Sequence, residues 1–553
     1  MSLKNAALAL VAALSIVACA KRSDAPKTST SVDAADVDKG SPLDKPYRVK
    51  NAEALDIDRL FEIFPLYLRP TYDKTHFDKK TGATIVENLK FGDGEFTAKR
   101  AEFYGVDLER IERVKAAADA ALDAPMQPVL AKLRLFDVGG KKAEENAGAL
   151  SIKAVEIDAL RIREGGVPKE SAASGLAAFF NAFDVAGVYF KDFSATGGDE
   201  SKSDTGAAFD FEVADLRFVG VGGGRLDAIV ARDFGYIIRQ SPATIAAAGK
   251  GLGPASDILL NGPLRNFILS ANQRVKVQSI EWKDIDFAGL MEYGLKGEKP
   301  PISARNLINL GTAHLVGAEQ FYGDKRVYVA PETDFSAMEF TWLLPSKIRA
   351  VSHGVLYDFT GYVADEEKDA IAALKSRGLD HVKADSDFAY DWGADSGAAV
   401  FSTGFDSSGF ADLNIYFGLE GLELKRIDAA RLAGEANAVA SLAKLKRFSF
   451  VVTDEQMLDA FYALSALQTG GEAKDVRAAT PALMRLTKVE LKRSNPRIAS
   501  YIDAIADFLE DGGTLEVKAE PESPVPLEAL GAAASGGPDA MAAAVNLTVT
   551  RKK

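Results

Sequence analysis

The stretch FEVADLRF, residues 211–218, carries apolar side chains at its first, third, sixth and eighth positions. In a plain strand the first and third positions would lie on one face and the sixth and eighth on the other. One extra residue, absorbed in a β-bulge near the fifth position, would keep all four side chains on one face. The stretch therefore predicts a bulged strand with one buried face.

Four similar stretches follow at intervals of 69, 70, 67 and 67 residues. They begin at Ile280 (IEWKDIDF), Ala350 (AVSHGVLY), Phe417 (FGLEGLEL) and Met484 (MRLTKVEL). The third is imperfect at Ser352, and residues 155–162 and 188–195 carry the pattern outside this register. We expect either a repeat of about 67–70 residues or a coincidence, because the interval exceeds the 20–50 residues of common repeats.

Helical patterns lie between these stretches. Asn495-Pro496 precedes apolar residues at helical spacing and Gly512 follows them, which indicates one helix. A capping box from Thr453 to Gln456 indicates another, with Met457, Phe461 and Leu464 buried. The fold expected is α+β, elongated, with mostly antiparallel bulged sheets and interspersed helices.

Residues 52–135 have the pattern of amphipathic helices instead. Asp107 is placed as an N-cap, and Leu108, Ile111 and Val114 follow on one face before Pro125 ends the pattern. The domains expected are a signal peptide (1–18), a lipidated disordered tether (19–46), a mainly helical region (47–150) and two sheet-and-helix regions (151–345 and 346–553).

The N-terminus has the order of a signal peptide. Lys4 precedes an apolar run over residues 6–17, which is too short for a transmembrane helix before Lys21 and Arg22. Residues 16–19, IVAC, resemble the bacterial lipobox, which implies cleavage before Cys19 and lipidation of its thiol. Ala20 implies sorting to the outer membrane. Cleavage after Ala20, leaving a soluble periplasmic protein, is the alternative.

Composition limits the possible partners and sites. The formal net charge is −13, which disfavours nucleic acid as a partner. Cys19 is the only cysteine, so disulfides and cysteine-based zinc sites are excluded. Residues 21–46 are polar and rich in Lys, Ser, Thr, Asp and Pro, which is typical of a disordered tether.

No catalytic motif is complete. The four histidines are not at ligand spacing, and His353 is expected to be a half-buried or edge residue of a strand. In residues 393–397, GADSG, the serine is one position too late for a nucleophile elbow. Ser441-x-x-Lys444 and Lys80-Thr81-Gly82 match motifs of penicillin-binding enzymes, but their order is reversed and Ser-Asp-Asn is missing, so a helix surface and a loop explain them better. The histidines are His76, His314, His353 and His381.

Two glycine clusters and one aspartate cluster have structural explanations. Residues 220–224 predict a hairpin turn, and residues 249–253 predict a helix end and a loop. The aspartates of residues 385–406 could bind calcium, but alternating antiparallel strands with polar turns are favoured. No cofactor and no metal is expected. These aspartates are Asp385, Asp387, Asp391, Asp395 and Asp406.

Three pieces of the sequence are distinctive: residues 344–349 (LPSKIR), residues 388–392 (FAYDW) with Gly397, and Phe508-Leu509 leading to Pro521 and residues 524–526 (PVP). Together they resemble uncharacterised exported lipoproteins of Gram-negative bacteria with repetitive sheet-and-helix bodies. The resemblance covers about residues 341–553 and implies no catalytic residue.

We expect a non-enzymatic envelope lipoprotein that binds or scaffolds a lipid, an envelope polymer or a protein partner. Trp282, Trp342 and Trp392 could lie on the wall of a binding groove, with core packing as the alternative for each. The opposing hypothesis is a hydrolase of envelope material with a carboxylate pair in a cleft.

Overall fold

The computed structural model describes residues 42–64, 69–91, 96–116, 124–140, 149–164, 177, 180–198, 207–240, 272–363, 367–434 and 441–553. The chain forms two compact units, residues 1–245 with 271–316 and residues 246–270 with 317–553. The division falls after Val316, inside β10 (Thr312–Tyr322), and not at the expected boundary of residue 345. Cys19, the signal peptide and the glycines of residues 249–253 lie outside the described residues.

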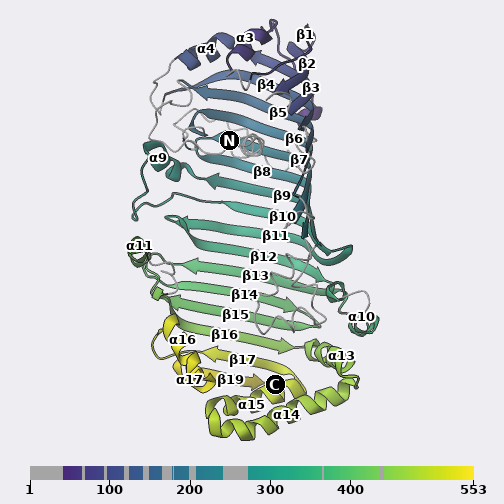
Figure 1. Cartoon of the computed structure of the whole chain (residues 1–553), viewed down its shortest axis with the longest axis vertical. Coiled ribbons are helices and arrows are strands. Elements are labelled where there is room, and N and C mark those ends of the chain that lie inside the picture. Colours follow the sequence, from purple (N-terminus) through teal and green to yellow (C-terminus); the bar gives the residue numbers. More distant parts are fainter. Residues whose placement is uncertain are drawn as a thin grey trace. The chain divides into compact units, whose positions relative to one another are not determined.

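Antiparallel strands that pair in sequence order form the first unit (Figure 1). The strands are β1 (Lys74–Asp78), β2 (Ala83–Phe91), β3 (Phe96–Val106), β4 (Met126–Gly140), β5 (Ala149–Arg163), β6 (Phe183–Gly198), β7 (Ala207–Gly222), β8 (Arg225–Gln240) and β9 (Asn272–Asp286). The helical elements are η1 (Pro42–Asp44), α3 (Ile57–Glu62), α4 (Leu108–Ala116) and α9 (Ala288–Lys296).

The expectation that residues 47–150 are mainly helical is wrong. Only α3 and α4 are helices there among the described residues, and β1 to β4 occupy much of the rest. The helix expected after Asp107 is present, and the carboxylate of Asp107 accepts a hydrogen bond from the Arg110 amide (2.9 Å). The pattern misled because strands that carry one extra residue no longer alternate strictly, so their apolar spacing resembles that of a helix.

Two rows of left-handed residues cross this sheet. The first left-handed row joins facing positions on β2 to β9, and every second strand has a positive φ there: Asn88 (53°), Asp137 (49°), Asp192 (46°) and Asp233 (49°). The second left-handed row uses the intervening strands: Gly105 (57°), Ala159 (51°), Gly220 (64°) and Asp284 (60°). Gly, Asn and Asp tolerate this conformation best, and Ala159 is the one residue of these eight that strains it.

These rows explain the apolar pattern of FEVADLRF and correct its interpretation. In β7 the extra residue is Ala214, and it faces the extra residues Asp192 of β6 and Asp233 of β8. The register with β6 is therefore the same at Val185–Val221 as at Gly198–Ala208. A β-bulge places two residues opposite one, whereas here each strand gains one residue.

The second unit pairs its strands in order as far as β17, with β19 next to β17 and β18 beside β16 (Figure 1). The strands are β11 (Lys325–Thr341), β12 (Leu344–Tyr357), β13 (Val382–Trp392), β14 (Ala399–Ser407), β15 (Ala411–Glu420), β16 (Lys444–Asp454), β17 (Gly513–Ala519), β18 (Val525–Pro526) and β19 (Leu547–Lys552). True register shifts occur here, as at Ser352/Val355 between β12 and β13. The pairings in both units are antiparallel, so the expected α+β class with mostly antiparallel sheets is confirmed.

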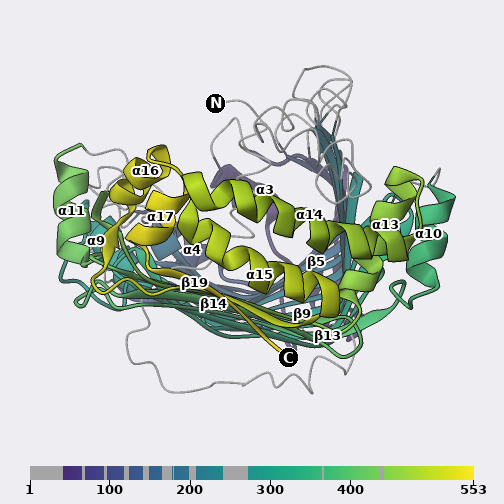
Figure 2. The ribbon, with the colours of Figure 1, turned by 90° about the horizontal axis from the view of Figure 1, so that it is seen from below.

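Helices of the second unit pack on one face at the C-terminal end of its sheet (Figure 1). Figure 2 shows α15 against the strands and α14 outside it. Val452 and Leu515 pack with Leu458, Tyr462 and Phe508 of the helices. The elements are η4 (Phe359–Tyr362), α10 (Lys368–Lys375), α11 (Leu424–Leu432), α13 (Met457–Thr469), α14 (Ala473–Ser494), α15 (Pro496–Asp511), α16 (Leu527–Ser535) and α17 (Pro538–Ala544).

The five stretches do not share one structure, so the expected repeat of about 67–70 residues stays a prediction. Phe211, Ile280, Ala350 and Phe417 lie in β7, β9, β12 and β15, but Met484 lies in α14. In residues 484–491 the apolar side chains are Met484, Leu486, Val489 and Leu491. The intervals of three (486 to 489) and seven (484 to 491) also place side chains on one face of a helix, and the alanines at 478, 479 and 482 favour the helix. The pattern over residues 417–424 likewise leaves β15 after Glu420 and enters α11.

The helices expected near residues 453 and 495 are confirmed as α13 and α15, with corrections at α13. Thr453 belongs to β16, and the side chain that accepts from a first-turn amide of α13 is Asp454, bonded to Leu458 N (2.8 Å). Phe461, expected to be buried, is exposed.

Replacing Asp233 by Val should lower the free energy of unfolding by about 1–2 kcal/mol, because a β-branched residue strains the left-handed conformation. Asp233→Gly should stay within about 0.5 kcal/mol of the natural protein. Gln278→Val is the matched control, since Gln278 of β9 is also exposed and faces Asp233 in the same row without a positive φ. Urea unfolding measures all three, and equal losses for the two valine variants would refute the role of the left-handed row.

Candidate functional site

Three rows of apolar side chains cross one face of the first sheet from β3 to β9. Each row consists of directly facing residues, so it runs perpendicular to the strands. The rows are Phe103–Leu133–Ile157–Val188–Phe218–Ile229–Trp282, then Ala101–Leu135–Val155–Phe190–Leu216–Ala231–Ile280, and Ala98–Val138–Ile152–Phe193–Val213–Phe234–Val277. We call this surface the apolar face.

Aromatic rings form a connected chain on the apolar face. Phe190 contacts Phe193 and Phe218 edge to face, with ring centroids 6.1 and 6.2 Å apart. Phe211 continues the chain to Phe193 (5.5 Å) and to Phe234 (5.2 Å). Such edge-to-face pairs stabilise packing by about 0.5–1.5 kcal/mol each beyond the area they bury.

The helices cover only one end of the apolar face among the described residues. Ile57, Leu60 and Phe61 of α3, with Leu108 of α4, pack over β2 to β4. Between β5 and β9 the described residues that pack together on this face come from strands, with Phe287 and Leu310 added.

Most residues of the three rows between β5 and β9 are buried, among them Val188 (1% exposed), Phe190 (4%) and Val213 (2%). Leu216, Ile229, Ile280 and Trp282 remain partly exposed. Trp282 donates its indole N–H to the carbonyl of Leu310 (2.5 Å), so its ring is fixed at the edge of the face. Trp392 is a core residue that donates to Leu422 O (2.9 Å), and Trp342 lies in the turn between β11 and β12.

The opposite face of the same sheet is charged, and Glu156 lies at its centre with 0% of its surface exposed. Lys132 Nζ lies 2.5 Å from Glu156 Oε1, and Arg134 Nε lies 2.7 Å from Oε2. Lys132 also approaches Asp158 (3.4 Å). Because both cations are buried too, each charge in this cluster depends on the others for compensation.

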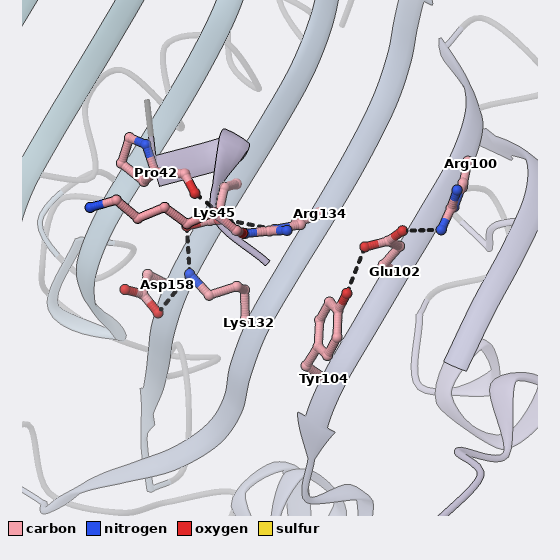
Figure 3. Close-up of polar contacts among 9 residues, drawn as sticks. Pro42, Lys45, Arg100, Glu102, Tyr104, Lys132, Arg134 and Asp158 are labelled. Carbon is pink, nitrogen blue, oxygen red and sulfur yellow. Dashed lines mark hydrogen bonds and ion pairs between the residues drawn. The ribbon is translucent and has the colours of Figure 1, made fainter. Parts of the chain in front are cut away.

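An N-terminal arm, residues 42–49, lies on this cluster (Figure 3). Arg134 Nη2 donates to the carbonyl oxygens of Lys45 (2.8 Å) and Pro42 (3.4 Å). The Tyr47 ring lies 4.8 Å from Lys132 Nζ and contacts the Tyr104 ring edge to face at 5.1 Å. The expected tether is therefore too long, because residues 42–46 belong to the folded body.

Tyrosines beside the cluster have raised pKa values. Burial, and then the carboxylates of Asp158 and Glu156, raise the pKa of Tyr189 to about 12. Burial and the hydrogen bond to Glu102 (2.7 Å) raise the pKa of Tyr104. Both phenols are neutral at physiological pH, so they act as hydrogen-bond partners and not as bases.

The histidines lie in separate elements. His353 is in β12 between β11 and β13 with 66% of its side chain exposed, so the expectation of a half-buried or edge position is wrong. Its Nδ1 lies 3.1 Å from Asp385 Oδ2. Asp385 also accepts from the Gly354 amide (2.6 Å), and these two hydrogen bonds lower the pKa of Asp385. His76, His314 and His381 lie in β1, in β10 and before β13.

Two residues of the serine motifs meet in one polar depression of about 340 Å³ in the second unit. Ser396 and Lys444 line it, with Glu420, Glu423 and Arg426 among the others. Ser396 Oγ donates to the carbonyl of Gly393 (3.3 Å), which is a turn contact. Ser441 lies just before β16, and residues 80–82 form the turn between β1 and β2, as expected.

The aspartate stretch forms antiparallel strands with polar turns, as expected. Asp385, Asp387 and Asp391 lie in β13 and Asp406 in β14, while Asp395 lies in the connecting turn. Asp391 pairs with Arg349. Within the described ranges no cluster of three or more His, Cys, Asp or Glu residues could hold a metal ion. The hairpin turn expected at residues 220–224 is confirmed between β7 and β8.

Comparison with known proteins adds one partial match. A family model described as "Uncharacterized protein" matches residues 404–552, which run from β14 to β19 and lie inside the region of the resemblance noted from sequence. No curated protein matches the chain. Among the described residues no helix is long and apolar enough to cross a membrane.

Sequence reasoning missed the buried Glu156 cluster. The signal was present in KLRL (residues 132–135) and VEID (residues 155–158), where charged residues alternate with apolar ones. Two such strands side by side place opposite charges on the face that the apolar residues leave.

Glu156→Ala should lower the free energy of unfolding by about 3–5 kcal/mol, because Lys132 and Arg134 would stay buried without their carboxylate. Glu281→Ala on the same face is the control. Glu281 pairs with Lys283 (2.7 Å), both side chains reach solvent, and the expected loss is below about 1 kcal/mol. Denaturant unfolding compares the two, and a loss for Glu156→Ala no larger than the control would contradict the assignment.

Proposed function

We propose that the protein is an envelope lipoprotein, lipidated at Cys19 and facing the periplasm from the outer membrane, that binds an acyl chain on the apolar face. The observation that carries the binding proposal is the continuity of the three apolar rows across seven strands. A row of directly facing side chains presents an unbroken apolar track, which is the surface that a hydrocarbon chain requires.

The length of the track supports an acyl chain. Strands lie about 4.7–4.9 Å apart, so the part of a row from β5 to β9, which α3 and α4 do not cover, is about 19 Å long. The hydrocarbon core of a bilayer is about 30 Å thick and two chains deep, so this part of a row is longer than the roughly 15 Å that one chain spans. Each methylene that leaves water on the track contributes about 0.8 kcal/mol.

The attachment of the N-terminal arm to the charged face supports an anchored protein in which the arm does not occupy the apolar face. Arg134 holds the arm on the charged face through Lys45 O, and Lys191 pairs with Asp44 (2.7 Å). The chain from Cys19 would thus join the body opposite the apolar face. As a flexible coil, residues 19–41 would span about 25–30 Å, enough to hold the body off the lipid surface.

Ile280→Lys should weaken binding of a fluorescent fatty acid at least tenfold, because a charge would lie in the middle row. Ser279→Lys is the matched control, since Ser279 is the preceding residue and points to the charged face. Energy transfer from Trp282 to the fatty acid, lost in Trp282→Phe, reports the position. Equal affinity of the two lysine variants, or no binding by the natural protein, would exclude the apolar face as the site.

Cys19→Ser should leave the protein unprocessed or release it from the membrane, because serine has no thiol to acylate. Membrane fractionation and the mass of the N-terminal peptide provide the measurement. A processed Cys19→Ser variant that still fractionates with membranes would show that the anchor lies elsewhere.

For the alternative, a hydrolase of envelope material, the polar depression with Glu420 and Glu423 is a candidate site. Each carboxylate is paired with a surface cation there, Lys446 for Glu420 and Arg426 for Glu423 (3.2 Å). A hydrolytic activity lost in Glu423→Gln, with unchanged melting, would favour this alternative.

A further inference from the structure

Helix α14 turns its charged side inward and its apolar side to solvent. Arg485 pairs with Asp507 (2.7 Å) and Glu510 (2.6 Å) of α15, and Lys488 pairs with Asp503. On the other side Leu483, Leu486 and Val489 are 61%, 68% and 69% exposed. This is the reverse of an ordinary surface helix, in which the apolar stripe faces the core. Figure 2 shows α14 as the outer helix of the pair.

The exposed side of α14 has the spacing of a coiled-coil seam. Its residues follow one another at intervals of four, three, four, three and four, which is the heptad pattern of helices that pair along their length. All six are exposed. The seam consists of Asp475, Ala479, Ala482, Leu486, Val489 and Arg493.

The seam is complementary to itself in the antiparallel direction. If two copies pair about a twofold axis near Met484, Asp475 of each copy faces Arg493 of the other. The same operation places Val489 against Ala479 and Leu486 against Ala482, so each large side chain meets a small one. A twofold interface requires one patch to fit its own copy, and this patch does so in charge and in size.

We propose that α14 is the interface through which two copies of this chain associate as an antiparallel helix pair. The charges argue against a lipid bilayer as the occupant, because a membrane-binding helix carries cations beside its apolar stripe. Here the stripe ends in one acid and one base, and the cations Arg485 and Lys488 are paired with α15. The inference is independent of the proposed function.

A single helix pair is a small interface, so the dimer is expected to be reversible and concentration-dependent. The terminal ion pairs are about 27 Å apart along the helix, at 1.5 Å per residue, and they fix the direction and register of the pair. Membrane attachment of the chain would add to the effective concentration without a new contact.

Charge reversal tests the direction of pairing. In a twofold dimer Asp475→Arg and Arg493→Asp each convert two attractive pairs into two repulsive ones, whereas the double variant restores both. Sedimentation velocity of the full chain at about 1–100 μM compares the natural protein, the two single variants and the double variant. Nonionic detergent keeps lipid at the N-terminus from driving association.

Lys492→Asp is the matched control, since Lys492 is exposed, adjacent to Arg493 and off the seam. It also imposes the same unfavourable charge on the helix C-terminus. Circular dichroism and melting check that α14 persists in every variant.

The expected result is a dissociation constant raised at least tenfold by each single reversal, returned to within about threefold of the natural value in the double variant, and unchanged in Lys492→Asp. A natural protein that stays monomeric over this range would overturn the proposal. So would single variants that associate normally, or a double variant that fails to recover, since the seam would then fit another partner.

Discussion

The first unit depends on a geometric constraint: a strand turns successive side chains to opposite faces, and any extra residue exchanges the faces beyond it. Eight left-handed residues each occur at a position where the neighbouring strands also carry the extra residue. The hydrogen-bonded register is the same on both sides of each row because neighbouring strands gain a residue at facing positions; the shift in the β4–β5 pairing lies beyond the rows, between Pro128 and Leu130. An extra residue in one strand alone would have moved half of its apolar side chains to the charged face.

Because the register is preserved, both faces become rows. The apolar face collects Val188, Phe190 and Phe218 next to one another, and the charged face collects Arg134, Glu156 and Tyr189 in one line. The buried Glu156 then requires Lys132 and Arg134 for compensation, and Arg134 uses its remaining donor to hold the N-terminal arm. The position of the arm thus follows from the same rows that create the apolar face.

Much of this could be predicted from sequence, and the failures have physical causes. FEVADLRF revealed one apolar face and one extra residue per strand. It could not show that the neighbours carry the same extra residue, because pairing is a long-range property; a bulge and a left-handed row leave the same local pattern. Aspartate at 137, 192 and 233 was the available signal, since Asp tolerates positive φ.

The helix α14 was not predicted from the sequence, because its apolar pattern was interpreted as a strand. MRLTKVEL fits a bulged strand and a helix equally well by apolar count, and the side of α14 that faces α15 is charged, so burial could not be inferred from hydropathy. The Glu156 cluster was missed for a related reason: two charged residues become one buried pair only when their strands are neighbours. The sequence pattern identifies the apolar and charged faces of one strand or helix. Which of these faces is buried depends on the strands and helices that pack beside it, which are distant in the sequence.

We propose that the partly exposed side chains of β5–β9 on the apolar face contact an acyl chain. The most direct measurement is photocrosslinking with a fatty acid that carries a diazirine near its methyl end, followed by peptide mapping. We expect adducts on apolar-face residues such as Leu216, Ile229 and Trp282. An unlabelled fatty acid should reduce the yield of these adducts by competition. Adducts confined to the charged face or to α14, or adducts that the competitor does not reduce, would contradict it.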